Sequence, residues 1–113
     1  MAKQIQDRCK EYNRELHPDW IGKEGKMNLS IYLSELYKKQ NGLCAISNEP
    51  MLLTVGLGKI NDDKCSPDRK NSKLGYVPNN MWLVTTWINT MKMDMPLKIF
   101  YNRIDIITNY KIK

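Results

Sequence analysis

Four polar residues in the middle of the chain have the types and order that metal-assisted chemistry on a phosphodiester requires. Asp68 and Arg69 are adjacent, Asn80 precedes a short apolar run, and Asn89 follows that run. Mg²⁺ prefers oxygen ligands and keeps several of its waters, so the carboxylate of Asp68 and the amide oxygen of Asn89 would suffice as protein ligands. The ion would neutralise charge on the phosphate and stabilise the leaving oxygen. These residues therefore predict a site for Mg²⁺ or Mn²⁺.

The same residues also have a purely structural interpretation. Aspartate and asparagine are common, so Asp68 could simply pair with a nearby arginine or lysine while Asn89 faces solvent. The spacing of the residues alone does not separate the two interpretations.

The elements that would position these residues can be predicted from hydrophobic periodicity and turn residues. Strands are expected over residues 65–70 and 81–84, with a loop over 71–80 between them. A helix is expected over 87–93, capped by one of the two threonines that precede it. The central segment should therefore form a strand, a loop, a second strand and a helix.

Two further helices are expected before this segment. Apolar residues at helical spacing indicate a helix over 2–16, which should end at His17 because the residue before a proline avoids the helical region. A second helix is expected over 29–40, after a loop over 19–26, with Asn28 or Ser30 as its cap and the pair Asn41–Gly42 as its left-handed end. The remaining expected elements are a strand over 43–46, a turn over 47–50, a returning strand over 51–55, a loop over 56–63 and a last helix over 97–110.

The apolar residues of these elements should form the core of a single domain spanning residues 1–113. Because small interiors are tightly packed, Trp87→Ala is expected to cost roughly 3 kcal/mol or more. The side chains expected to be largely buried are Leu33, Leu36, Cys44, Ile46, Leu83, Val84, Trp87, Ile88, Met91, Ile99 and Phe100.

The charge balance indicates a polyanion as the partner. The formal net charge is +6 and the sequence pI is about 9.3. Each phosphate that a basic protein neutralises releases counterions, which favours nucleic acid. No apolar run approaches the ~20 residues that a membrane span requires, and the first residues lack the apolar core of a secretory signal. We therefore expect no membrane partner and a cytoplasmic location.

The cysteines and histidine argue against a structural zinc ion. Cys9, Cys44 and Cys65 are an odd number without a CxxC pair, and His17 is the single histidine. A disulfide framework and a four-ligand zinc site both need more ligands than these.

Residues 41–92 resemble the HNH, or His-Me-finger, nucleases, in a zinc-free branch of phage type. The resemblance rests on three pieces of sequence, which keep the order and spacing of that branch. They are GLCAISNEPM over residues 42–51, the residues Ser66, Asp68, Arg69, Ser72, Gly75, Tyr76, Asn80, Leu83 and Val84 of the central segment, and INTMK over residues 88–92.

This resemblance implies an α+β fold with a ββα-metal core over 41–93, an extra short hairpin, and flanking helices over 1–40 and 96–113. It implies that Asp68 and Asn89 ligate Mg²⁺ or Mn²⁺ and that Asn80 stiffens the loop by bridging its backbone groups. Trp82 or Trp87 would pack beneath the site. The resemblance gives the catalytic set as Asp68, Arg69, Asn80 and Asn89.

The sequence departs from the family pattern where the catalytic histidine is usually found. Arg69 holds this position, and an arginine stays protonated, so it is a poor general base. It could instead hold the scissile phosphate with two hydrogen bonds. His17, Glu49, Lys70 and a metal-bound water remain as candidate bases. Asn71 stands where the branch usually has aspartate.

Basic residues around the motif suit contact with a phosphate backbone. Arg69, Lys70, Lys73 and Lys92 are the candidate nucleic-acid-binding residues, with double-stranded DNA as the leading partner. Two functions follow as expectations. The first is a metal-dependent endonuclease that cuts or nicks DNA with little sequence preference, in phage DNA processing or host attack. The second is an HNH-fold protein that binds nucleic acid, or inhibits, after hydrolysis has been weakened or lost.

Overall fold

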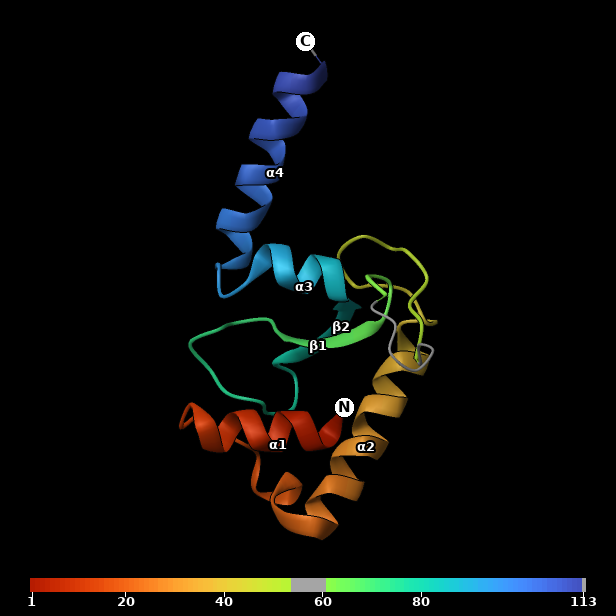
Figure 1. Ribbon diagram of the computed structural model, residues 1–113, viewed down its shortest axis with the longest axis vertical. Coiled ribbons are helices and arrows are strands. Elements are labelled where there is room, and N and C mark those ends of the chain that lie inside the picture. Colours follow the sequence, from red (N-terminus) through yellow and green to blue (C-terminus); the bar gives the residue numbers. More distant parts are fainter. Residues whose placement is uncertain (54–60, 113) are drawn as a thin grey trace.

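The computed structural model of the chain describes residues 1–53 and 61–112 (Figure 1). A two-stranded antiparallel sheet lies at the centre, with helices on both sides of it, so the α+β class is confirmed. In chain order the elements are α1 (Ala2–Glu11), the 3-10 helix η1 (Pro18–Trp20), α2 (Gly22–Lys39), β1 (Cys65–Arg69), β2 (Met81–Thr85), α3 (Thr86–Lys92) and α4 (Leu97–Ile112).

The central segment has the predicted order of elements. β1 and β2 pair from Cys65 opposite Thr85 to Arg69 opposite Met81. α3 follows β2 without a break and lies along one side of the strand pair, while α1 lies on the other side (Figure 1). The predicted strands and helix of this segment are therefore confirmed to within a residue or two.

The first helix ends earlier than predicted. The expected helix over 2–16 stops at Glu11, because Asn13 adopts a left-handed φ of 52° and Arg14 N–H donates to the carbonyl of Cys9 at 2.9 Å. The residues that follow run extended, and Leu16 forms a bridge with Tyr76 in the loop between the strands. The segment predicted as the last helical turn therefore holds that loop in place.

The second helix begins much earlier than predicted, at Gly22 rather than near Leu29. The expected loop over 19–26 and the expected cap at Asn28 or Ser30 are wrong. Gly25 lies inside the helix against the backbone of Trp20, where a Cβ atom would collide with the Trp20 carbonyl carbon. The glycine thus allows close packing. The predicted end is confirmed, with Asn41 and Gly42 both at positive φ.

The predicted hairpin over 43–55 is reduced to turns and single bridges. Leu43 and Pro50 form an isolated antiparallel bridge, and Cys44 N–H donates to the carbonyl of Glu49 at 2.8 Å. The strand expected over 43–46 is therefore wrong. Of the returning strand expected over 51–55, the structure has one bridge, between Leu52 and Lys64. Residues 54–60 of that strand and the following loop lie outside the described residues.

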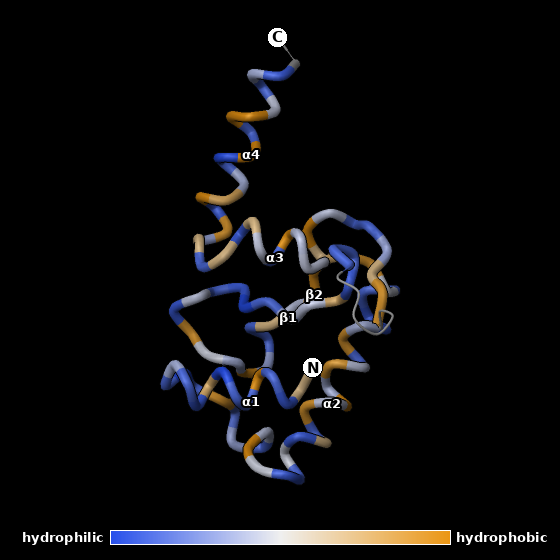
Figure 2. The backbone as a smooth tube through the Cα atoms, viewed as in Figure 1, coloured by the Kyte–Doolittle hydropathy of each residue, from blue (hydrophilic) through white to orange (hydrophobic). Residues whose placement is uncertain are grey.

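The last helix has the predicted position but projects away from the rest of the protein (Figure 1). Its first half is packed, chiefly through Phe100 and in part through Ile104, while Ile106 is 61% exposed and Tyr110 77% exposed. Figure 2 shows apolar residues along this projecting helix. The expectation that Ile99 is buried is wrong, as it is for Met91 on α3. Leu36, Ile46 and Trp87 are partly buried, and Leu33, Cys44, Leu83, Val84, Ile88 and Phe100 are buried as predicted.

In the described part of the chain, the helices are all too short or too polar to cross a lipid bilayer.

Candidate functional site

The carboxylate of Asp68 is surrounded by protein partners. Asp68 lies on β1 directly opposite Trp82 of β2, whose indole Nε1 donates to Asp68 Oδ2 at 2.7 Å. Lys92, at the last turn of α3, places its Nζ 3.2 Å from Oδ1 and 3.2 Å from Oδ2. Asp68 is 5% exposed and Lys92 is 1% exposed. Both carboxylate oxygens are therefore engaged inside the protein, by an ammonium group and an indole.

Asn89 lies beside this pair but bonds to a different residue. Its Nδ2 donates to Ser66 Oγ at 2.8 Å. Ser66 and Asp68 share one face of β1, because alternate residues of a strand point the same way. Asn89 and Lys92 share one face of α3, because residues three apart on a helix are neighbours. The helix thus docks on the strand through two adjacent polar pairs, Asn89 with Ser66 and Lys92 with Asp68.

Arg69 holds the loop between the strands. Its Nη1 donates to the carbonyl oxygens of Ser72 at 2.7 Å and Leu74 at 3.0 Å, and its Nη2 lies 3.2 Å from Asp94 Oδ1. The guanidinium carbon is 5.6 Å from the centre of the Tyr76 ring. Arg69 is buried, and these contacts occupy both of its terminal nitrogens. The side chain therefore acts on the loop backbone, not on a ligand.

Asn80 bonds across the same loop. Its Nδ2 donates to the carbonyl oxygens of Gly75 at 2.8 Å and Asn71 at 3.2 Å, and its Oδ1 accepts from Asn71 N–H at 3.0 Å. An amide side chain can donate and accept at once, so one buried residue fixes both ends of the loop. Arg69 and Asn80 together hold the loop in one conformation.

The single histidine has a local role at the start of η1. His17 Nδ1 accepts a hydrogen bond from the backbone N–H of Asp19 at 3.2 Å, which caps that short helix. Its backbone N–H donates to the carbonyl of Tyr76 at 3.0 Å. His17 therefore connects the segment before α2 with the loop that Arg69 and Asn80 hold.

The four candidate nucleic-acid contacts divide into two kinds. Lys70 and Lys73 are exposed, and Lys70 Nζ lies 5.7 Å from the centre of the Trp82 ring. Arg69 and Lys92 are buried and already paired. Lys92 therefore lies inside the protein, and Arg69 is bound to the loop between the strands and to Asp94.

The residues present do not fit a divalent cation in this arrangement. An ion bound to Asp68 would take the place of Lys92 Nζ, and the displaced ammonium has a 1% exposed side chain and no carboxylate other than Asp68 within salt-bridge distance among the described residues. The Lys92 ammonium is the cation that neutralises Asp68 here.

Two cysteines near the start of β1 have shifted acidities. Burial raises the pKa of the Cys65 thiol to about 11, with a further contribution from Cys44. For Cys44, burial acts in the same direction, but hydrogen bonds from Ser47, Thr85 and Ile46 outweigh it and lower its pKa. The backbone N–H groups of Thr85 and Ser47 lie 3.4 Å and 3.5 Å from Cys44 Sγ. Cys44 thus joins the turn after α2 to the end of β2.

Sequence reasoning missed the internal partners of the predicted site residues. Lys92 was expected at the surface, and the roles of Ser66 and Asp94 were not foreseen. The spacing of the residues could have indicated the roles of Lys92 and Ser66. Lys92 is three residues from Asn89 on a helix, and Ser66 is two residues from Asp68 on a strand, so each shares a face with a predicted site residue. Nothing local marks Asp94 as the partner of Arg69.

No family model, no curated protein and no solved structure matches this chain.

Proposed function

We propose that this chain binds nucleic acid through a unit related to the HNH finger, and that Lys92 stands where such a finger would hold its metal ion. The observation that carries this proposal is the pairing of Lys92 Nζ with both oxygens of Asp68, each at 3.2 Å, with both residues buried. The ammonium supplies the positive charge that the carboxylate needs. The strand–strand–helix unit is thereby held together by its own side chains.

The position of the usual catalytic base supports the same proposal. Arg69 stands there, and both of its terminal nitrogens are bound to the loop and to Asp94. A protonated guanidinium cannot accept a proton from water. Hydrolysis needs an activated water, and neither Arg69 nor the paired Asp68 is arranged to provide one.

Exposed lysines around the strand–strand–helix unit are the residues that contact phosphate in this proposal. Lys70 follows β1 directly, and Lys73 lies in the loop that Arg69 and Asn80 hold rigid. A rigid loop keeps its charges in place, so less conformational entropy is lost on binding. Contacts of this kind carry little sequence information, and double-stranded DNA is the partner they suit. The net charge of +6 adds a long-range attraction.

A metal-dependent endonuclease is the second candidate, and one observation favours it. The candidate ligands Asp68 and Asn89 come from adjacent polar pairs at a single contact between β1 and α3. For an Mg²⁺ or Mn²⁺ ion to bind there, Lys92 would have to leave Asp68. This function therefore requires a rearrangement at the end of α3.

A cleavage assay separates the two functions. Supercoiled plasmid is incubated with the purified protein and Mg²⁺ or Mn²⁺, and duplex binding is followed by fluorescence anisotropy. We expect binding that weakens with salt and no nicking. Nicking that chelation abolishes, and that Asn89→Ala also abolishes while the thermal melt is retained, would establish the endonuclease and overturn the proposal.

Paired lysine variants test the location of the contact. Lys70→Gln with Lys73→Gln should weaken duplex binding about tenfold or more, because two phosphate contacts are lost. The matched control is Lys38→Gln with Lys39→Gln, which removes the same charge from the exposed end of α2. Equal losses in the two double variants would show that only overall charge matters, and would contradict the proposed contact.

A further inference from the structure

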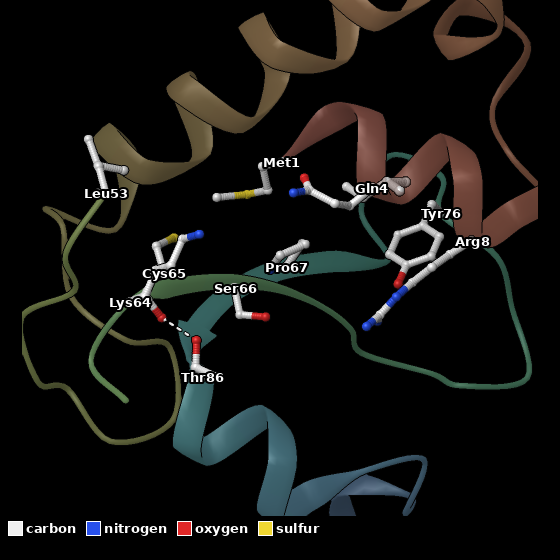
Figure 3. Close-up of a pocket in the computed structure, with 11 residues that line it drawn as sticks. Met1, Gln4, Arg8, Leu53, Lys64, Cys65, Ser66, Pro67, Tyr76 and Thr86 are labelled. Carbon is white, nitrogen blue, oxygen red and sulfur yellow. Dashed lines mark hydrogen bonds between the residues drawn. The ribbon is translucent and has the colours of Figure 1, made fainter. Parts of the chain in front are cut away.

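We infer that the cavity between α1 and β1 binds a single nucleotide unit, with its phosphate held by cationic and hydroxyl groups and its base by an apolar wall. This inference rests on the proposed function, because it names a part of a nucleic acid that this protein would hold. The cavity has a volume of about 260 Å³ and lies on the side of β1 that faces α1 (Figure 3). Its lining shares Ser66 with the contact between β1 and α3 described above, and it includes Thr86 at the start of α3.

The charged groups that line this cavity are all positive. Arg8 of α1 and Lys64, just before β1, line it together with polar and apolar residues, and the lining contains no carboxylate. Neither side chain forms a salt bridge within the described residues. Two cations that no described carboxylate neutralises favour an anion in this cavity.

The Tyr76 hydroxyl adds hydrogen-bond capacity to the same wall. Tyr76 is 3% exposed, and no described residue forms a hydrogen bond with its hydroxyl. Every fully buried polar side-chain atom of the described residues has a hydrogen-bond partner, so this hydroxyl is not fully buried. The small exposed part of Tyr76 is therefore its hydroxyl, which Figure 3 shows in the cavity with Arg8. The Ser66 hydroxyl points to the α3 side of β1, where its Oγ accepts from Asn89 Nδ2. A phosphate oxygen is a suitable acceptor for the Tyr76 hydroxyl.

The rest of the lining is apolar and extends the site beyond a phosphate. Ile5 of α1 and Cys65 of β1 are buried, and the Pro67 ring and Leu53 also line the cavity. A water molecule takes about 30 Å³ in the liquid, so the cavity has the volume of roughly eight or nine waters. This leaves apolar space beside a bound phosphate group. A nucleotide, which joins a phosphate to a flat ring system, suits both parts of the wall.

A neighbouring cavity lacks this combination. The one beside the loop is lined by Arg69 and Lys73, but also by Glu15 and Asp94, whose carboxylates would repel a phosphate. A cavity between α1 and α2 has no charged side chain in its lining. Among these three cavities, only the one between α1 and β1 offers cations, the Tyr76 hydroxyl and an apolar wall without a carboxylate.

The test follows amide chemical shifts of the full chain during titration with deoxyadenosine 5′-monophosphate, inorganic phosphate and deoxyadenosine. We expect the nucleotide to shift Ile5, Arg8, Ser66 and Tyr76, and to bind at least about tenfold more tightly than phosphate alone. Arg8→Gln should weaken nucleotide binding about tenfold, which corresponds to the loss of one charged contact worth about 1.4 kcal/mol. Lys3→Gln is the matched control, because Lys3 lies on the same helix but outside the lining.

Three outcomes would overturn the inference. They are shifts that avoid the cavity, phosphate binding as tight as nucleotide binding, and equal effects of Arg8→Gln and Lys3→Gln. Duplex binding, measured in parallel, separates this inference from the proposed function. Duplex binding without nucleotide shifts at the cavity would refute the nucleotide site alone, and nucleotide binding without duplex binding would refute the proposed function alone.

Discussion

The contact between Asp68 and Lys92 removes two opposite charges from water, and the cost of this is several kcal/mol for each ion. Mutual attraction offsets part of the cost, and hydrogen bonds offset more. Trp82 Nε1 donates to the carboxylate, and Lys92 Nζ also lies 3.4 Å from the carbonyl oxygen of Arg69. Such a pair is sensitive to the loss of one partner, because the other is left charged and buried.

A pair of variants measures this sensitivity. Lys92→Met should lower the free energy of unfolding by about 3–5 kcal/mol, because Asp68 then lacks its counter-charge. Adding Asp68→Asn to Lys92→Met should recover part of this loss, because the buried charge is removed as well. Urea unfolding of the wild type, both single variants and the double variant gives the coupling energy. Additive losses would contradict a direct buried pair.

Cys65 should make the protein less stable at alkaline pH. Its pKa is raised from 9.0 to about 11 in the folded protein, so the folded state favours the protonated thiol. The stabilising contribution is therefore complete below pH 9 and is lost as the pH rises toward 11, by an amount on the order of 2 kcal/mol. Urea unfolding between pH 8 and pH 11 should show a steeper loss for the wild type than for Cys65→Ala. Parallel curves would contradict this assignment.

At the scale of single residues, the sequence predicts which side chains matter better than it predicts their partners. Asp68 and Asn89 lie in polar contacts between β1 and α3, and Asn80 bonds across the loop between the strands. The structural interpretation of Asp68, pairing with a nearby lysine, describes its contact in this structure. Whether Asp68 meets a metal or Lys92 depends on how deeply α3 is buried against β1, which is a tertiary property that no local spacing encodes.

Among the elements, the strands and the short helix could be predicted because apolar runs and turn residues mark them locally. The start of α2 could not, because Gly22 and Gly25 favour a loop by propensity. Packing of Gly25 against Trp20 overrides that propensity. The burial of α4 was also mispredicted. Its apolar spacing is that of a core helix, but among the described residues only its first half, as far as Ile104, packs against the core.

Two substitutions on α4 should therefore have very different effects. Phe100 is buried against the core, so Phe100→Ala should cost about 3–5 kcal/mol of unfolding free energy. Ile106 is 61% exposed on the same helix, so Ile106→Ala should change stability by no more than about 0.5 kcal/mol. Thermal melts or urea unfolding measure both. A large loss for Ile106→Ala would indicate that the far end of α4 is packed.

The whole molecule is elongated, at 53 × 32 × 27 Å, and carries a net charge of +6. The cations do not all serve one purpose. Arg69 and Lys92 are buried and paired inside the protein, whereas Lys70, Lys73, Arg8 and Lys64 are exposed. Net charge read from sequence therefore overstates the charge that a partner can reach around the central segment.

The salt dependence of duplex binding should show how many phosphate contacts the protein makes. The logarithm of the duplex association constant is expected to fall linearly with the logarithm of salt concentration, with a slope of about −0.9 for each phosphate contact. Removing Lys70 and Lys73 should therefore reduce the magnitude of the slope by about 1.8. Anisotropy titrations at several salt concentrations measure it. An unchanged slope would mean that these two lysines do not touch the backbone.

The extended residues after α1 are bonded to the loop between the strands. Tyr76 N–H donates to the carbonyl of Glu15 at 2.9 Å, and His17 N–H donates to the carbonyl of Tyr76 at 3.0 Å. A ribosome adds about 5–20 residues per second, so the roughly 60 residues from Glu15 to Tyr76 take about 3–12 s to make. During translation, the segment around Glu15 must therefore remain without this partner for several seconds, and its hydrogen bonds to Tyr76 can form only after the loop between β1 and β2 has been synthesised.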